Sequence, residues 1–278
     1  MTRRFLWLAC LGFALAMSCN SEDKKTTEEK KDTVKTFSPK EEEVTYTSGD
    51  KTMRSFVVYD QNREGKRPAV LVIPEWWGVN DYAKTRAREL AELGYIAIAV
   101  DMFGEGKTAD NPDSAGALVK PFYADPQLAK TRFDAALEKV KSYPQADSTV
   151  VGAIGYCFGG AVALNMARLG ENLKGVVSFH GNLLGVPADK NTLKAELLIC
   201  QGGADPFVPM SELALFEKQM DSIGAKYTVK VYEGATHAFT NPAATALGEK
   251  FKLPIAYNAA ADTASYKEMV IFFDRVLK

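Results

Sequence analysis

The stretch TVVGAIGYCFGG, residues Thr149–Gly160, joins a predicted strand to a predicted helix. Small and β-branched residues lead into the turn, and a helical pattern follows it. The turn, Gly155-Tyr156-Cys157-Phe158-Gly159, matches a Gly-x-nucleophile-x-Gly elbow with cysteine in the place of serine. A Cβ at either glycine would collide with neighbouring backbone. We expect the turn to raise Cys157 above the sheet edge, at a helix N-terminus that favours the thiolate. The alternative is a small buried cysteine in an ordinary turn.

Strand and helix patterns alternate from about residue 43 to the end of the chain. Apolar runs predict strands at Met53–Tyr59 (an edge strand), Ala69–Ile73, Tyr95–Val100, Thr149–Ile154, Gly175–Phe179, Leu197–Cys200 and Tyr227–Val231. Helical patterns lie at Asp81–Leu93, Gln127–Ser142, Phe158–Leu169, Ser211–Ile223 and Ala261–Leu277. This alternation predicts an α/β fold, a mostly parallel sheet with helices on both faces and no large cap domain. Ligands of such sheets bind where the strands end, so the chemistry is expected in the loops that follow them.

Two of these loops supply partners for Cys157. Asp205 follows the strand 197–200, and His237 follows the strand 227–231, which gives the chain order nucleophile, acid, base. In a triad, His237 would take the thiol proton and later protonate the leaving alcohol, while Asp205 would fix the tautomer of the imidazole. The alternatives are that Asp205 caps the next helix and that His237 is an ordinary loop histidine.

The chain has only two histidines, and the other one, His180, ends the strand 175–179. We expect His180 to line the substrate pocket, with replacement of the base as the alternative. Cys200 ends a buried strand and is expected in the core; a Cys157–Cys200 disulfide would abolish the nucleophile. The sequence has neither His-x₃-His nor Cys-x₂-Cys, and no Walker loop or dinucleotide fingerprint before a helix, so it predicts no metal and no cofactor.

Four motifs in register resemble those of the dienelactone hydrolase family, over roughly residues 45–278. They are Pro74-Glu75-Trp76-Trp77-Gly78-Val79-Asn80, the elbow 155–160, Gly203-Ala204-Asp205 and Thr236-His237-Ala238-Phe239. The resemblance implies the α/β-hydrolase fold with a Cys157–Asp205–His237 triad.

The resemblance also implies roles for the residues that follow the first buried strand. The backbone N–H groups of Trp76 and Phe158 would form the oxyanion hole. Glu75 would be a buried carboxylate, with a raised pKa, that contacts the resting thiol and helps to deprotonate it. The alternative is that backbone N–H groups satisfy Glu75.

The sequence departs from the family in the part that binds substrate. Family members hold the dienelactone carboxylate with two arginines, and the corresponding positions here are Asn241 and Glu105. A carboxylate clamp needs fixed positive charge, which Lys107 would replace only in part. We therefore expect a neutral or differently shaped ester or lactone. The expected substrate-binding residues are Trp77, Phe103, His180, Phe239 and Asn241, although some of these aromatic residues are core residues in the alternative reading.

The expected activity is thus hydrolysis of a small ester or lactone. A thioesterase, acyltransferase or peptidase on the same fold is one alternative, and a non-catalytic binding lipoprotein is another. The chain has 34 Lys and Arg against 35 Asp and Glu, a formal charge of −1, so it lacks the basic excess that binds nucleic acid. The sequence does not specify an oligomeric state.

Residues 1–19 resemble a bacterial lipoprotein signal peptide. Arg3 and Arg4 precede an apolar stretch that is short for a membrane span and ends in Leu15-Ala16-Met17-Ser18-Cys19. The resemblance implies lipidation of Cys19 and export to a membrane-anchored position in the periplasm or on the outer surface. A cleaved secretory signal, giving a soluble protein, and an uncleaved anchor are the alternatives. Residues 20–43 are polar and charged and predict a disordered tether, which leaves 44–278 as the folded domain.

Overall fold

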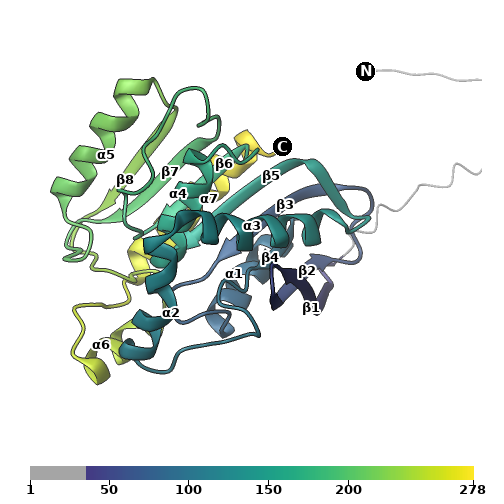
Figure 1. The fold of residues 1–278 in the computed structure, drawn as a ribbon, viewed down its shortest axis with the longest axis horizontal. Helices are drawn as coiled ribbons and strands as arrows, with labels where there is room; N and C mark the ends of the chain where they lie inside the picture. Colours follow the sequence, from purple (N-terminus) through teal and green to yellow (C-terminus); the bar gives the residue numbers. More distant parts are fainter. Residues whose placement is uncertain (1–35) are drawn as a thin grey trace, which may run out of the picture. The chain divides into compact units, whose positions relative to one another are not determined.

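An eight-stranded sheet runs through the computed structural model, which describes residues 36–278 (Figure 1). The strands are β1 (Pro39–Ser48), β2 (Lys51–Asp60), β3 (Arg67–Ile73), β4 (Ile96–Ala99), β5 (Ala146–Tyr156), β6 (Gly175–Phe179), β7 (Glu196–Gly202) and β8 (Tyr227–Tyr232). Their order is β1-β2-β4-β3-β5-β6-β7-β8. β1 pairs antiparallel with β2, and β2 with β4, while every other neighbouring pair is parallel. The predicted mostly parallel sheet is confirmed.

Helices cover both faces of this sheet. They are α1 (Asp81–Glu92), α2 (Pro112–Ala124), α3 (Pro126–Lys141), α4 (Phe158–Arg168), α5 (Met210–Ile223), α6 (Ala244–Phe251) and α7 (Ala259–Val276). Side chains of α2 to α5 contribute to the core on one face, and side chains of α1 and α7 to the core on the other. Within β3, Leu71 and Ile73 belong to the first core, whereas Val70 and Val72 belong to the second. Burial on both faces explains why this strand is a continuous apolar run.

β1 begins inside the segment that we expected to be a tether. Residues 39–43 pair with β2, so the ordered domain starts before residue 44, and β1 rather than β2 is the edge strand. Ion pairs tie this strand to α1: Glu41 to Arg88 at 2.6 Å and Glu43 to Lys84 at 2.9 Å. An edge strand can be polar, because backbone hydrogen bonds to its one neighbour hold it in the sheet. The polar composition of residues 39–43 therefore gave no sign of a strand. The remainder of the predicted tether up to residue 35, and the predicted signal peptide with Cys19, lie outside the described residues.

Two further helices, α2 and α6, were not predicted. α2 begins at a recognisable start signal, in which the Asn111 side chain accepts the Ser114 N–H and Pro112 follows the cap. α6 has only eight residues and ends at Lys252 in the left-handed conformation. Both helices supply walls of the pocket described below. Within residues 36–278, no helix combines the length and the apolar character that a membrane crossing requires.

Candidate active site

Cys157 occupies a strained turn between β5 and α4. Its backbone has φ 54° and ψ −119°, a conformation that residues with a Cβ rarely adopt. The two flanking glycines make the turn possible. A Cβ on Gly155 would lie 2.0 Å from the Gly159 carbonyl oxygen, and a Cβ on Gly159 would lie 2.1 Å from the carbonyl oxygen of Ile73. The turn leaves the Cys157 side chain half-buried at the wall of a pocket.

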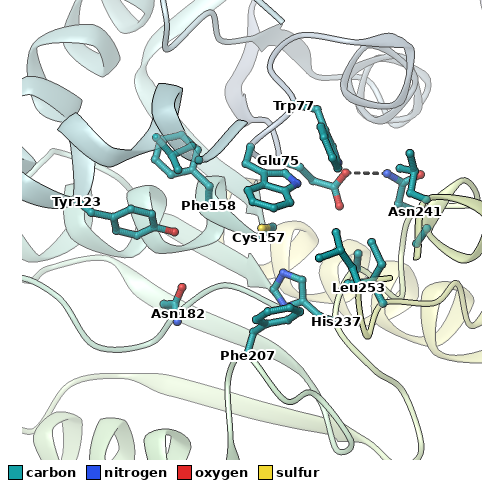
Figure 2. Close-up of a pocket in the computed structure, with 17 residues that line it drawn as sticks. Glu75, Trp77, Tyr123, Cys157, Phe158, Asn182, Phe207, His237, Asn241 and Leu253 are labelled. Carbon is teal, nitrogen blue, oxygen red and sulfur yellow. Dashed lines mark hydrogen bonds between the residues drawn. The ribbon is translucent and has the colours of Figure 1, made fainter. Parts of the chain in front are cut away.

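The structure places His237 beside this thiol (Figure 2). Asp205 is hydrogen-bonded to the His237 ring. Nδ1 of His237 lies 2.8 Å from Oδ2 of Asp205, and Oδ1 of Asp205 accepts the backbone N–H groups of Phe207 and Val208. Burial lowers the pKa of His237, but the hydrogen bond and charge of Cys157, with those of Asp205, raise it to about 10. The site therefore favours an imidazolium next to the sulfur at neutral pH.

Two backbone N–H groups at this pocket have no acceptor among the described residues. Trp76 and Phe158 both line the pocket with Cys157. Among the hydrogen bonds of residues 36–278, neither the Trp76 N–H nor the Phe158 N–H is a donor. Phe158 is the first residue of α4, so its N–H has no partner within the helix. Such free donors are what an oxyanion hole requires.

Glu75 is buried in the same pocket, with 3% of its surface exposed. Its Oε2 accepts a hydrogen bond from Nδ2 of Asn241 at 2.6 Å (Figure 2). The Asn241 amide is itself oriented, because its Oδ1 accepts the Ala243 N–H at 2.9 Å. Burial raises the pKa of Glu75 to about 7, although the Asn241 hydrogen bond and the His237 charge lower it. Within the described part of the chain, the hydrogen-bond partner of Glu75 is therefore Asn241 and not the thiol that we expected.

The pocket holds about 240 Å³ and is mostly apolar. Among the described residues that line it, the ionisable side chains are Glu75, Tyr123, Cys157 and His237, and none is lysine or arginine. Beside the expected Trp76, Trp77 and Phe158, its wall contains side chains that the sequence analysis missed. These are Val119 and Tyr123 of α2, Leu247 of α6, and Asn182, Phe207, Leu253 and Ile255 from loops.

Comparison with known proteins identifies the family of this chain. The sequence model described as "Dienelactone hydrolase family" matches residues 53–277. The chain belongs to the dienelactone hydrolase family. Its fold is the α/β-hydrolase fold, and family membership supports a hydrolase.

Relatives in this family include "Protein usf" of Aquifex pyrophilus, which is 32% identical over 180 residues, 63% of this chain and 77% of that protein. A protein of Aquifex aeolicus named "Putative carboxymethylenebutenolidase" is 32% identical over 179 residues, which are 63% of this chain and 77% of that protein. Among solved structures, a dienelactone hydrolase-like promiscuous phosphotriesterase from metagenomic libraries is 33% identical with a TM-score of 0.81, covering 86% of this chain and 99% of that one.

Three residues expected to bind substrate in this family member do not line the pocket. Phe239 is fully buried and packs on Tyr232, with ring centroids 5.4 Å apart. Phe103 packs on Phe158, with ring centroids 6.0 Å apart. His180 is fully buried beneath the elbow. Aromatic composition near a motif indicates burial, but it does not show whether a side chain faces the cavity or the core.

Cys200 is a core residue, as its position at the end of a buried strand predicted. It is fully buried and unpaired, and Cys157 is also a free thiol, so the alternative of a disulfide between them is wrong. Signals for some missed pocket residues were present in the sequence. Phe207 stands two residues after the acid Asp205, and Asn182 two residues after His180, both in loops that follow strands.

Proposed function

We propose that this protein hydrolyses small neutral esters or lactones with Cys157 as the nucleophile. One observation carries the proposal. A half-buried thiol at a strained elbow shares an apolar pocket with His237, whose imidazole is hydrogen-bonded to a buried carboxylate. Nucleophile, base and orienting acid are the three groups that acyl transfer requires.

The first half-reaction forms a thioester. The Cys157 sulfur attacks the carbonyl carbon, a C–S bond forms, and the carbonyl π electrons move to the oxygen. The N–H groups of Trp76 and Phe158 would donate to this oxyanion. When the intermediate collapses, the C–O bond breaks, and the His237 imidazolium gives its proton to the leaving alkoxide. The products are an alcohol and an acylated Cys157.

The second half-reaction releases the acid. His237, now neutral, takes a proton from water, and the resulting hydroxide attacks the thioester carbonyl. Collapse of this second intermediate breaks the C–S bond and expels the thiolate. The carboxylic acid leaves, and the thiolate and imidazolium are restored, with Asp205 holding the same Nδ1 proton throughout.

The charges at the pocket restrict the class of substrate. A carboxylate on the substrate would find no lysine or arginine among the described lining residues, and the His237 imidazolium is already paired with Cys157 and Asp205. It would also face Glu75, which ionises near neutral pH. An unpaired charge in such a site is costly, so the pocket favours uncharged substrates. Neutral phosphotriesters meet the same condition, and the 33% identical relative named a promiscuous phosphotriesterase makes them a sensible addition to a substrate panel.

Glu75 has a proposed part in the same reaction. It would act on molecules in which the sulfur is still protonated. When substrate displaces Glu75 from Asn241, a buried carboxyl with a pKa near 7 can take up the thiol proton and leave the thiolate that attacks. Glu75→Gln should then lower turnover while the fold survives. Unchanged turnover in this variant would remove Glu75 from the mechanism.

A panel of p-nitrophenyl esters and small lactones tests the function, with wild type, Cys157→Ala and Cys157→Ser. We expect wild type to release p-nitrophenol with a burst and then a steady rate, and Cys157→Ala to show only the background rate. Equal rates for wild type and Cys157→Ala would identify a binding protein or another nucleophile instead.

We also propose that the protein is exported and anchored to a membrane through a lipid on Cys19. The support is the sequence alone: Arg3 and Arg4, the apolar stretch after them, and the run 15–19 that ends in cysteine. Labelled palmitate should enter the wild-type protein in a bacterial host and should be absent from Cys19→Ala. Equal labelling of the two proteins, or none of either, would contradict lipidation at this residue.

A further inference from the structure

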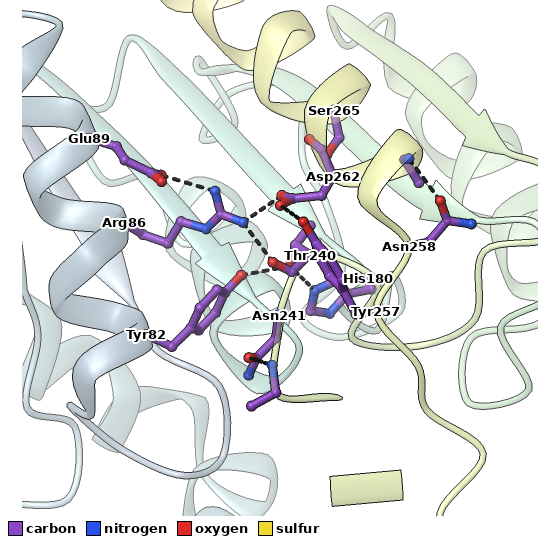
Figure 3. A network of polar contacts seen from close by, with 12 residues as sticks. Tyr82, Arg86, Glu89, His180, Thr240, Asn241, Tyr257, Asn258, Asp262 and Ser265 are labelled. Carbon is purple, nitrogen blue, oxygen red and sulfur yellow. Dashed lines mark hydrogen bonds and ion pairs between the residues drawn. The ribbon is translucent and has the colours of Figure 1, made fainter. Parts of the chain in front are cut away.

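His180 lies beneath the nucleophile elbow and makes a hydrogen bond with each ring nitrogen. Its Nδ1 accepts the backbone N–H of Cys157 at 3.1 Å. Its Nε2 lies 2.8 Å from Oγ1 of Thr240, a contact that Figure 3 shows. We propose that His180 is a positioning residue whose Nδ1 holds the Cys157 backbone in its strained conformation, and that turnover depends on this bond rather than on the bond to Thr240. The inference rests on the proposed function.

The two hydrogen bonds fix the tautomer of the ring. The Cys157 N–H can only donate, so Nδ1 must be unprotonated, and the single ring proton lies on Nε2 and is donated to Thr240. Burial, and then the neighbouring His237 charge, hold the pKa of His180 well below its usual 6.5. The ring is therefore neutral at pH 7, and Nδ1 remains an acceptor.

The nucleophile needs such support because its backbone is strained. Cys157 and His180 have positive φ, at 54° and 42°, and directly follow β5 and β6; Ala238, in the loop after β8, also has positive φ, at 58°. Strained residues persist only where their surroundings over-determine them. The Cys157 N–H also donates to the Phe179 carbonyl at 3.0 Å, so the His180 ring is the second of two acceptors that aim this peptide.

Thr240 connects the His180 ring with the rest of the site (Figure 3). Its Oγ1 also lies 2.7 Å from the Tyr82 hydroxyl, and its carbonyl accepts from Nη2 of Arg86 at 2.7 Å. Two side chains of α1 therefore contact Thr240, and one of them, the buried Arg86, also pairs with Asp262 of α7. Thr240 stands three residues after His237, and through it the His180 ring links the nucleophile turn to the base loop.

Two amide substitutions separate the roles of the two nitrogens. His180→Asn places an amide oxygen near the Nδ1 position, so it can still accept from Cys157 while it loses the bond to Thr240. Asparagine also tolerates a φ of 42° well. His180→Gln reaches the Nε2 position, so it keeps the Thr240 bond and loses the acceptor for Cys157. Thr240→Val removes the same bond as His180→Asn and is its matched control.

The measurement is kcat per active thiol, with the thiol titrated by the p-nitrophenol burst. We expect His180→Asn and Thr240→Val to stay within about threefold of wild type, and His180→Gln to fall at least tenfold with little change in KM. A purely structural role would instead reduce the fraction of active protein and leave kcat per active thiol unchanged. If His180→Gln does not fold, His180→Phe replaces it, since phenylalanine keeps the ring contacts to Phe239 and His237 without either nitrogen.

Two results would overturn the inference. One is an unchanged kcat per active thiol in His180→Gln or His180→Phe, and the other is an equal loss in His180→Asn. Either result, together with a normal burst in wild type, contradicts only the role of His180. A wild-type protein without a Cys157-dependent burst contradicts the proposed function and this inference with it.

Discussion

Asp205 faces His237 with one oxygen only. Its Oδ2 lies 2.8 Å from Nδ1 of the ring, while its Oδ1 accepts two backbone N–H groups, from Phe207 at 2.8 Å and from Val208 at 3.2 Å. The carboxylate is therefore held in one orientation by the turn that follows β7. The Nδ1 proton has a fixed acceptor, and the other nitrogen of the ring is left for the thiol.

This arrangement predicts a large effect of Asp205→Asn on turnover. The amide oxygen would remain on the two backbone donors, and the amide NH₂ would turn to Nδ1 and force the ring proton onto Nε2. In that tautomer the imidazole cannot take the thiol proton. We expect kcat to fall by about 10³–10⁴-fold in a steady-state ester assay, with an unfolding transition near that of wild type. A loss below tenfold would show that Asp205 does not set the tautomer.

The raised pKa of Glu75 predicts that the difference in stability between Glu75→Gln and wild type depends on pH. Its pKa rises from 4.5 to about 7 on folding, so the folded state binds more protons between these values and loses stability as the pH rises through them. The full cost above pH 7 is up to about 3 kcal/mol. Glu75→Gln avoids this cost, so its gain over wild type should be near zero at pH 4.5 and largest at pH 8.

Urea denaturation at the two pH values measures that gain. Glu249→Gln, on the exposed side of α6, is the matched control for the loss of one negative charge. If the free energies of unfolding of Glu75→Gln and wild type differ by the same amount at pH 4.5 and pH 8, a buried, proton-binding Glu75 is ruled out.

Two glycine substitutions should act in opposite directions on the free energy of unfolding. Gly155→Ala places a Cβ 2.0 Å from the Gly159 carbonyl oxygen and should destabilise the fold by about 1–3 kcal/mol or more. Gly116→Ala lies inside α2, where a Cβ meets nothing within 4 Å, and should stabilise by about 0.5–1 kcal/mol. Chemical denaturation measures both. Equal effects of the same sign would contradict the packing described at the elbow.

Substrate charge should control KM. An ester with a free carboxylate at its far end should have a KM at least about tenfold above that of the matching methyl ester, because the pocket offers that carboxylate no lysine or arginine among its described residues. Glu75→Gln should reduce the ratio of the two KM values. Equal KM values in wild type would contradict a pocket that selects against substrate carboxylates.

The sheet and the catalytic loops could be predicted because their signals are local. β6 was predicted to the residue, since Gly175–Phe179 is buried on both faces and reads as an unbroken short run. The loops of Asp205 and His237 follow from strand ends in the same way. β1 could not be found by this route, because its first five residues carry no large apolar side chain and depend on pairing with β2.

The pocket wall was less accessible to prediction. α2 and α6 both line the pocket although they are far apart in the sequence, and the sequence does not show which of their faces is turned inward. His180 illustrates the limit most clearly. Its place after β6 suggested a pocket residue, but a φ of 42° turns the ring under the elbow, and sequence carries no sign of that angle.

The most direct test of the account is to look for the acyl group on Cys157. Wild-type protein mixed with p-nitrophenyl acetate, quenched with acid within the burst and digested, should yield a peptide with one acetyl group on Cys157 that hydroxylamine removes. Cys157→Ala should yield no such label. Rapid hydrolysis by wild type without any acetyl group on Cys157 would contradict the cysteine mechanism.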